Sequence, residues 1–247
     1  MSTTKKVALI TGANKGLGLE TARQLGKQGI TVLIGARDAA RGNNAAEELT
    51  KEGIDAHFIH IDMEKPESFQ EVYKTIESKY GKLDILVNNA GISIENGGWG
   101  VNTVTTSSRA DLVKTFDTNF FNVIGLTQVL LPLIQKSEAG RIVNLSSILA
   151  SLELHASPGS PIYDAKAFAY DASKTALNQF TVHLAHAVKG TNIKVNSAHP
   201  GWVKTDMGTD AAPMEIPDGA KTSVWLATLP ADGPNGGYFH MQDKLPW

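Results

Sequence analysis

The chain has 247 residues, with 23 basic and 25 acidic side chains, a formal net charge of −2 and no cysteine. This balance argues against a nucleic-acid or anionic-membrane surface, which needs an excess of Lys and Arg, and the lack of cysteine excludes disulfides, thiolate catalysis and cysteine-ligated zinc. Because no apolar run approaches 18 residues and the N-terminus lacks a signal-peptide pattern, we expect a cytoplasmic protein that makes no membrane contact.

Short apolar runs recur along the chain and lack polar alternation. They are Val7–Ile10, Ile30–Ala36, Ala56–Ile61, Leu83–Asn88, Arg141–Leu145, Ile193–Ala198 and a candidate last run, Gly237–His240. Runs without alternation are typical of strands buried on both faces, as in a parallel sheet covered by helices.

Longer stretches with helical patterning separate these runs, at about 17–28, 39–52, 66–80, 109–136 and 170–189. Gly29 suits a left-handed helix end, Pro66 suits a helix start, and Ser108 with Asp111 resembles a capping pair. The alternation predicts an α/β fold. We expect residues 1–247 to form a single doubly wound (Rossmann) domain, with a mostly parallel seven-stranded sheet and helices on both faces.

Three irregular segments follow strand ends: Glu95–Ser107, Ser151–Ala169 and Pro200–Pro217. Ligands of open α/β sheets bind beyond the carboxyl ends of the strands, so these segments are candidate walls of a substrate pocket as well as plain surface connections. Trp99, Trp202 and Met207 lie on them. These side chains belong either to the core or to a pocket, and in a pocket they would favour an apolar carbonyl compound.

The first strand runs into a glycine-rich turn, Thr11–Gly18, with the spacing G-x-x-x-G-x-G. Glycines permit a tight turn and let the backbone approach a pyrophosphate at a helix N-terminus, where free N–H groups and the dipole favour an anion. The alternative is a plain strand-to-helix turn.

The end of the second strand bears on the choice of dinucleotide. NAD-binding units usually place an acid there, whereas this chain has Ala36 followed by Arg37. A guanidinium can bind a phosphate with two hydrogen bonds, and Lys15 adds a second positive charge. We therefore predict NADPH over NADH. In the competing interpretation, Asp38 turns inward and accepts from the ribose hydroxyls.

Seven motifs in order make the chain similar to the short-chain dehydrogenase/reductase family, and most similar to its carbonyl-reductase-like, NADPH-dependent members. They are Thr11–Gly18, Asp62, Asn88–Gly91, Asn119, Ser146–Ser147, Tyr170–Lys174 and Pro200–Thr205. The stretch between Ser147 and Tyr170 is longer than in the shortest members and much shorter than in the monomeric animal carbonyl reductases. A monomer and a homo-oligomer therefore both stay open.

Tyr170 and Lys174 are four residues apart, so they share one face of a helix, and a nearby ammonium lowers the pKa of a tyrosine. The resemblance implies that Tyr170 is the proton donor, that Lys174 tunes it and holds the nicotinamide ribose, that Ser147 hydrogen-bonds the substrate oxygen, and that Asn119 holds a water linked to Lys174. A surface helix pair is the plain alternative. Tyr163 lacks a lysine four residues on.

The expected cofactor-binding residues, most of them implied by the resemblance, are Gly12, Asn14, Lys15, Gly16, Leu17, Gly18, Arg37, Asp62, Met63, Asn89, Ala90, Gly91, Tyr170, Lys174, Pro200, Gly201, Val203 and Thr205. The expected substrate-binding residues are Trp99, Ser147, Tyr170, Trp202 and Met207. We expect no metal, because no third ligand accompanies His183 and His186 at helical spacing.

The function expected from these residues is NADPH-dependent reduction of an aldehyde or ketone to an alcohol. Two alternatives remain: alcohol oxidation by the same site, and a regulatory protein that senses NADPH without catalysis. The second is disfavoured because a pure sensor has no use for a proton donor, although a fold alone does not exclude it.

Overall fold

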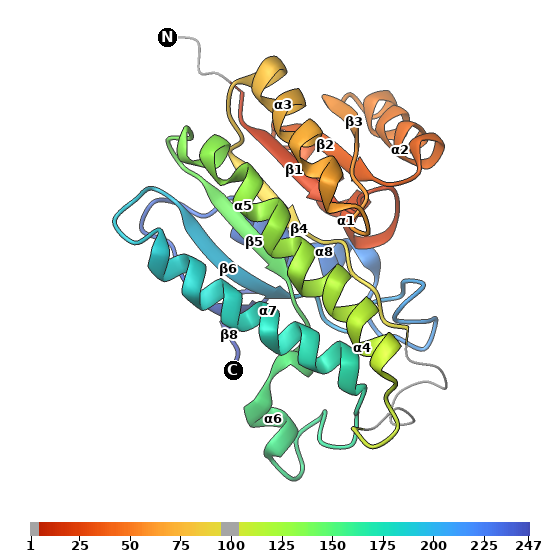
Figure 1. Ribbon diagram of the computed structural model, residues 1–247. Coiled ribbons are helices and arrows are strands. Elements are labelled where there is room, and N and C mark those ends of the chain that lie inside the picture. Colours follow the sequence, from red (N-terminus) through yellow and green to blue (C-terminus); the bar gives the residue numbers. More distant parts are fainter. Residues whose placement is uncertain (1–4, 95–103) are drawn as a thin grey trace.

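The computed structural model describes residues 5–94 and 104–247 (Figure 1). One sheet forms the centre of the fold, with the strand order β3-β2-β1-β4-β5-β6-β7-β8. The strands are β1 (Val7–Thr11), β2 (Thr31–Ala36), β3 (Ala56–His60), β4 (Ile85–Asn88), β5 (Arg141–Leu145), β6 (Lys194–His199), β7 (Tyr238–His240) and β8 (Asp243–Lys244). Neighbours from β3 to β7 pair in parallel, and β8 runs antiparallel beside β7.

Helices cover both faces of the sheet. The larger ones are α1 (Gly16–Gly26), α2 (Ala39–Lys51), α3 (Phe69–Tyr80), α4 (Arg109–Phe116), α5 (Asn122–Gln135), α7 (Phe168–Ala187) and α8 (Ile216–Ala227). One core joins α3, α5 and α7 to the sheet, and the other joins α1, α2 and α8 to the opposite face. In Figure 1, α3, α5 and α7 lie side by side across the near face. The predicted doubly wound α/β fold is confirmed.

Burial follows the sequence pattern closely. Every residue of β1 and β2 is buried, as expected for strands covered on both faces, whereas the edge strand β3 has buried, half-buried and exposed positions. Two of the predicted helix starts hold: Pro66 opens a short 3-10 turn before α3, and the Ser108 hydroxyl accepts from the Asp111 N–H at 3.0 Å at the start of α4. The predicted left-handed helix end at Gly29 is wrong, because α1 ends at Gly26 with Lys27 as its C-cap; Gly29, with φ +81°, lies in the turn that follows.

Four features differ from the prediction. An eighth strand, β8, extends the expected seven-stranded sheet. The helix predicted over 109–136 is divided by a π-helical turn, Asp117–Phe121, and the irregular segment 151–169 contains a short helix, α6 (Leu152–Ala156). We did not predict α8, which packs against α1. None of the helices in the described residues is long and apolar enough to cross a membrane.

Candidate active site

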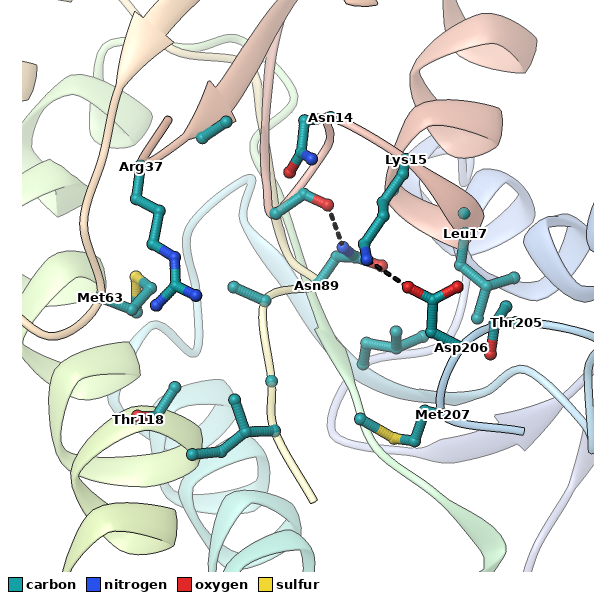
Figure 2. Close-up of a pocket in the computed structure, with 18 of the residues that line it drawn as sticks. Asn14, Lys15, Leu17, Arg37, Met63, Asn89, Thr118, Thr205, Asp206 and Met207 are labelled. Carbon is teal, nitrogen blue, oxygen red and sulfur yellow. Dashed lines mark hydrogen bonds and ion pairs between the residues drawn. The ribbon is translucent and has the colours of Figure 1, made fainter. Parts of the chain in front are cut away.

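A cleft of about 860 Å³ lies beyond the carboxyl ends of the central strands, where the order along the sheet reverses between β1 and β4. The residues that line it come from distant parts of the chain (Figure 2). Predicted residues that line it are Gly12, Asn14, Lys15, Gly16, Leu17, Gly18, Arg37, Asp62, Met63, Asn89, Ala90, Gly91, Thr205 and Met207.

The glycine turn has the backbone that a close anion contact needs. Gly12 and Gly16 both have positive φ, at +63° and +57°. A Cβ on Gly18 would lie 2.5 Å from Asn89 Nδ2, so this position packs directly against the loop after β4. Among the described residues, no side chain caps the N-terminus of α1 and no acid stands in its first turn. Its positive dipole end therefore faces the cleft without a side-chain cap or an acid from its own first turn.

Two of the cations that line the cleft, Arg37 and Lys15, each have an acidic partner. The Arg37 guanidinium lies 2.9 Å from Glu64 Oε1, and Lys15 pairs with Asp206 across the cleft, as Figure 2 shows. Both cations are more than half exposed, so they are accessible to an incoming phosphate. Asp38 caps α2 instead, since its carboxylate accepts from the Arg41 N–H at 2.9 Å. Asp38 is also not among the residues that line the cleft, which disfavours the competing interpretation.

Tyr170 and Lys174 lie on α7 and are both nearly buried, with 7% and 4% of their surfaces exposed. Lys174 Nζ lies 5.7 Å from the centroid of the Tyr170 ring and donates to the Leu145 carbonyl at 2.7 Å. Burial lowers the pKa of Lys174 to about 8. The surface-pair alternative is thus disfavoured, because these two side chains are packed into the protein.

Glycine at position 91 brings the lysine next to the cleft. A Cβ on Gly91 would lie 3.3 Å from Lys174 Nζ and 3.3 Å from Asn119 Oδ1. Gly91 and Leu145 both line the cleft, so the ammonium that contacts them lies at its inner wall. This contact places the buried lysine at the cleft, although Tyr170 and Lys174 are not among its lining residues.

Asn119 lies in the π-helical turn and has no exposed surface. Its amide oxygen accepts from the Ile92 N–H at 2.8 Å, and its amide nitrogen donates to the Ile92 carbonyl at 2.8 Å and to Ser173 Oγ at 3.1 Å. The side chain therefore joins the loop after β4 to α7. Its predicted contact with a water remains a prediction.

The two serines after β5 occupy different surroundings. Ser146 is buried, with its hydroxyl unpartnered among the described residues, whereas Ser147 is partly exposed and its hydroxyl accepts from the Leu149 N–H at 3.3 Å. Only Ser147 is open to a ligand at its surface. Ser147 is thus the more accessible of the two serines, although it is not among the residues that line the cleft, and its contact with a substrate remains a prediction.

Several predicted residues lie away from the cleft lining. Pro200, Gly201 and Val203 do not line it; Val203 is buried and bridges to Met214. Trp202 also lies outside the lining: it is half exposed, and its indole N–H donates to the Gly208 carbonyl at 2.8 Å. Trp99 lies outside the described residues.

Sequence reasoning missed the acidic partners of the two cations. Glu64 and Asp206 both line the cleft, as do Thr118 and Lys204. Glu64 follows the predicted pair Asp62–Met63, and Asp206 follows Thr205, so adjacency to predicted positions was the available signal. In the described part of the chain, no group of three or more His, Asp or Glu side chains is arranged to hold a metal ion.

Comparisons with known proteins show the family to which this chain belongs. The family model for short chain dehydrogenases matches residues 6–216. Short-chain dehydrogenase/reductase 1 of Saponaria officinalis is 35% identical, with 98% of this chain and 96% of the relative aligned. The chain belongs to the short-chain dehydrogenase family. The predicted family and oxidoreductase class are therefore confirmed.

Other similar proteins align with this chain over almost the full length of both proteins. Carbonyl reductase 1 of Mus musculus, whose name includes NADPH, is 33% identical, with 100% of each chain aligned. The solved structure of the carbonyl reductase Sniffer of D. melanogaster has a TM-score of 0.84 at 29% identity, covering 99% of this short-chain dehydrogenase and 100% of that chain.

Proposed function

We propose that this short-chain dehydrogenase reduces an aldehyde or ketone to an alcohol, with Tyr170 as the proton donor. One observation carries the proposal: a tyrosine and a lysine are buried together on α7, and the lysine ammonium contacts the wall of a cleft at the carboxyl edge of the sheet. Relatives named carbonyl reductase support the reaction class.

NADP(H) is the cofactor. The residues present fit it, because an uncapped helix N-terminus with two positive-φ glycines offers N–H groups to a pyrophosphate, and exposed Arg37 and Lys15 offer cations to a further phosphate. When bound, this cofactor would supply the hydride for the carbonyl carbon. The mouse relative with NADPH in its name supports this assignment, as does the solved structure of a short chain dehydrogenase from Shigella flexneri complexed with NADP, which has a TM-score of 0.80 at 27% identity.

The protein's own residues would handle the proton and the oxygen. Tyr170 would donate its hydroxyl proton to the carbonyl oxygen, and Ser147 would donate a hydrogen bond to the same oxygen. Lys174 would favour the phenolate left behind, since an adjacent ammonium stabilises that charge. The desolvated surroundings of Lys174 strengthen this attraction compared with water.

The test follows NADPH absorbance with a panel of aldehydes, ketones and quinones. We expect turnover with at least one carbonyl compound and a loss of roughly 10²–10⁴-fold in Tyr170→Phe, with the NADPH dissociation constant nearly unchanged. Tyr163→Phe is the matched control: it removes a hydroxyl from an exposed tyrosine and should retain activity. Normal turnover in Tyr170→Phe would refute the mechanism.

A further inference from the structure

The peptide group that joins Ser147 to Ile148 is held from both sides by side chains of the last strands. Its carbonyl, the Ser147 oxygen, accepts from the Tyr238 hydroxyl and from the Ala150 N–H at 2.9 Å. Its N–H, that of Ile148, donates to His199 Nδ1 at 3.1 Å. Both polar groups of this one peptide thus have side-chain partners.

These bonds begin where the sheet ends. The Ser146 N–H donates to the Ala198 carbonyl at 2.8 Å, which is the final backbone bond between β5 and its neighbour β6. Beyond it, the backbone at Ser147 is extended, with φ −152° and ψ 154°, and then turns into a 3-10 turn, Ile148–Ala150. Side chains of two other strands, Tyr238 on β7 and His199 on β6, therefore hydrogen-bond the backbone just beyond the end of β5.

Tyr238 is built as a fixed donor. Its side chain is fully buried, and its ring stacks on that of Trp247, with 5.6 Å between ring centroids and 19° between planes. Burial, with a contribution from the charge of Tyr170, raises the pKa of the Tyr238 hydroxyl far above its usual range. The hydroxyl thus keeps its proton for the Ser147 carbonyl. A phenylalanine would fill the same core volume without this bond.

His199 is the matching acceptor. It is buried, and its ring packs against His240 at a centroid distance of 4.9 Å. Burial, followed by repulsion from His240, lowers the pKa of His199 to about 3, so the ring is neutral at physiological pH. Because the Ile148 N–H is a donor, the lone pair must be on Nδ1 and the ring proton on Nε2. The His240 ring in turn bonds the His199 carbonyl through Nδ1 at 3.0 Å.

We propose that Tyr238 and His199 are positioning residues for Ser147: by fixing the Ser147–Ile148 peptide plane, they set the direction from which the serine hydroxyl meets the substrate oxygen. This inference rests on the proposed function, because it gives Ser147 that contact. Rotation of the plane would shift the backbone on which the hydroxyl stands, and displacements of about 1 Å can cost up to two orders of magnitude in rate.

The first experiment compares single variants during carbonyl reduction. Tyr238→Phe keeps the ring and its stack on Trp247, and we expect kcat to fall roughly tenfold with an unchanged NADPH dissociation constant. Tyr73→Phe is the matched control: it removes a tyrosine hydroxyl that donates to Glu77 at 3.0 Å, on α3, and should keep full activity. An unchanged kcat in Tyr238→Phe would overturn the proposal.

Rescue by geometry tests the histidine. In His199→Asn, the amide oxygen can take the place of Nδ1, whereas in His199→Gln the polar atoms lie farther along the side chain. We expect kcat near the wild-type value for Asn and roughly tenfold lower for Gln. Equal kcat losses in both variants would indicate packing alone and contradict the proposal.

A double-mutant cycle separates positioning from general packing. If Tyr238 acts through Ser147, Tyr238→Phe should cost nothing further in a Ser147→Ala background, whereas independent effects would multiply. A large loss in Ser147→Ala with no loss in Tyr238→Phe would defeat the positioning role and leave the proposed function standing. Wild-type turnover in Ser147→Ala would also defeat the positioning role, because the reaction would then not need the serine hydroxyl, and carbonyl reduction with Tyr170 as the proton donor would still stand.

A readout without turnover completes the test. The Ile148 amide should exchange its hydrogen faster in His199→Gln than in the wild type, and at the wild-type rate in Tyr73→Phe. If the protein reduced no carbonyl compound, the proposed function would fail, and this exchange rate would still decide whether the peptide is held. An unchanged rate in His199→Gln would overturn the proposal whatever the activity.

Discussion

The two ends of the cleft hold their cations in opposite ways. At the glycine turn, Lys15 and Arg37 are exposed and paired with the carboxylates of Asp206 and Glu64. On α7, Lys174 is buried and donates to a backbone carbonyl, with a pKa lowered to about 8. Exposed pairs can exchange one anion for another at low cost, which suits phosphate binding. Burial shifts proton affinities, which suits proton transfer.

Removing the buried charge should give the largest effect. We expect Lys174→Met, which preserves length and apolar packing, to lower kcat roughly 10²–10³-fold, because the phenolate of Tyr170 loses its cation. Wild-type kcat/KM should fall as pH rises above about 8, where the ammonium loses its proton, and this limb should vanish in the variant.

The measurement is a pH profile of NADPH oxidation for both proteins. Lys189→Met, an exposed lysine beyond α7, serves as the control and should retain the wild-type profile. If kcat/KM fell with rising pH in the same way in the wild type and in Lys174→Met, the buried Lys174 would not control the pH dependence, and the contrast between buried and exposed cations would fail.

Loss of the exposed cation at Arg37 should change cofactor choice more than chemistry. Charged hydrogen bonds contribute about 1.5–3 kcal/mol, so Arg37→Ala should reduce the NADPH:NADH ratio of kcat/KM roughly 10- to 100-fold. Glu64→Gln, which removes the partner and keeps the guanidinium, should preserve the ratio or raise it. The assignment fails if the ratio stays the same in Arg37→Ala.

His199 is another buried titratable group, and its effect should appear in the stability of the protein at acidic pH. Its folded pKa is about 3, against a usual 6.5, so between these values the unfolded chain binds a proton that the folded chain does not. The free energy of unfolding therefore falls as pH falls through this window, by about 1.4 kcal/mol per unit from this group. In His199→Asn, this one-proton contribution to the pH dependence of the free energy of unfolding should be lost.

Urea denaturation at pH 7, 6 and 5 measures this slope. His183→Asn is the control, because His183 is exposed on α7, and it should reproduce the wild-type slope. A wild-type slope in His199→Asn would show that burial of His199 does not govern its protonation.

The sequence predicted most of the sheet but only part of the helical layer. Strands such as β1 and β2 are largely apolar runs, so their positions follow from the pattern. The missed helix α8 contains Pro217 and Gly219 and buries most of its length, which removes the apolar stripe that identifies a surface helix. The π-helical turn inserts one residue per turn and has no simple sequence signature.

The site divides in the same way. The glycine turn and the Tyr170–Lys174 pair are local patterns, readable without tertiary structure. The contacts of Arg37 with Glu64, Lys15 with Asp206 and Tyr238 with Ser147 span 27, 191 and 91 residues. Contacts over such separations depend on strand order and loop paths, which a single sequence does not specify.

The smallest effect should come from the carboxylate opposite Lys15. Asp206→Asn releases the lysine for a phosphate, so NADPH should bind more tightly, by no more than about fivefold because the pair is exposed. Titration at 20 and 500 mM salt tests this, since screening should remove most of the gain. Lys15→Met should change affinity in the opposite direction. Weaker NADPH binding in Asp206→Asn would contradict this expectation. It would mean that the Asp206 carboxylate does not compete with a phosphate for Lys15, and that the ion pair instead holds the loop after β6 in the conformation that binds the cofactor.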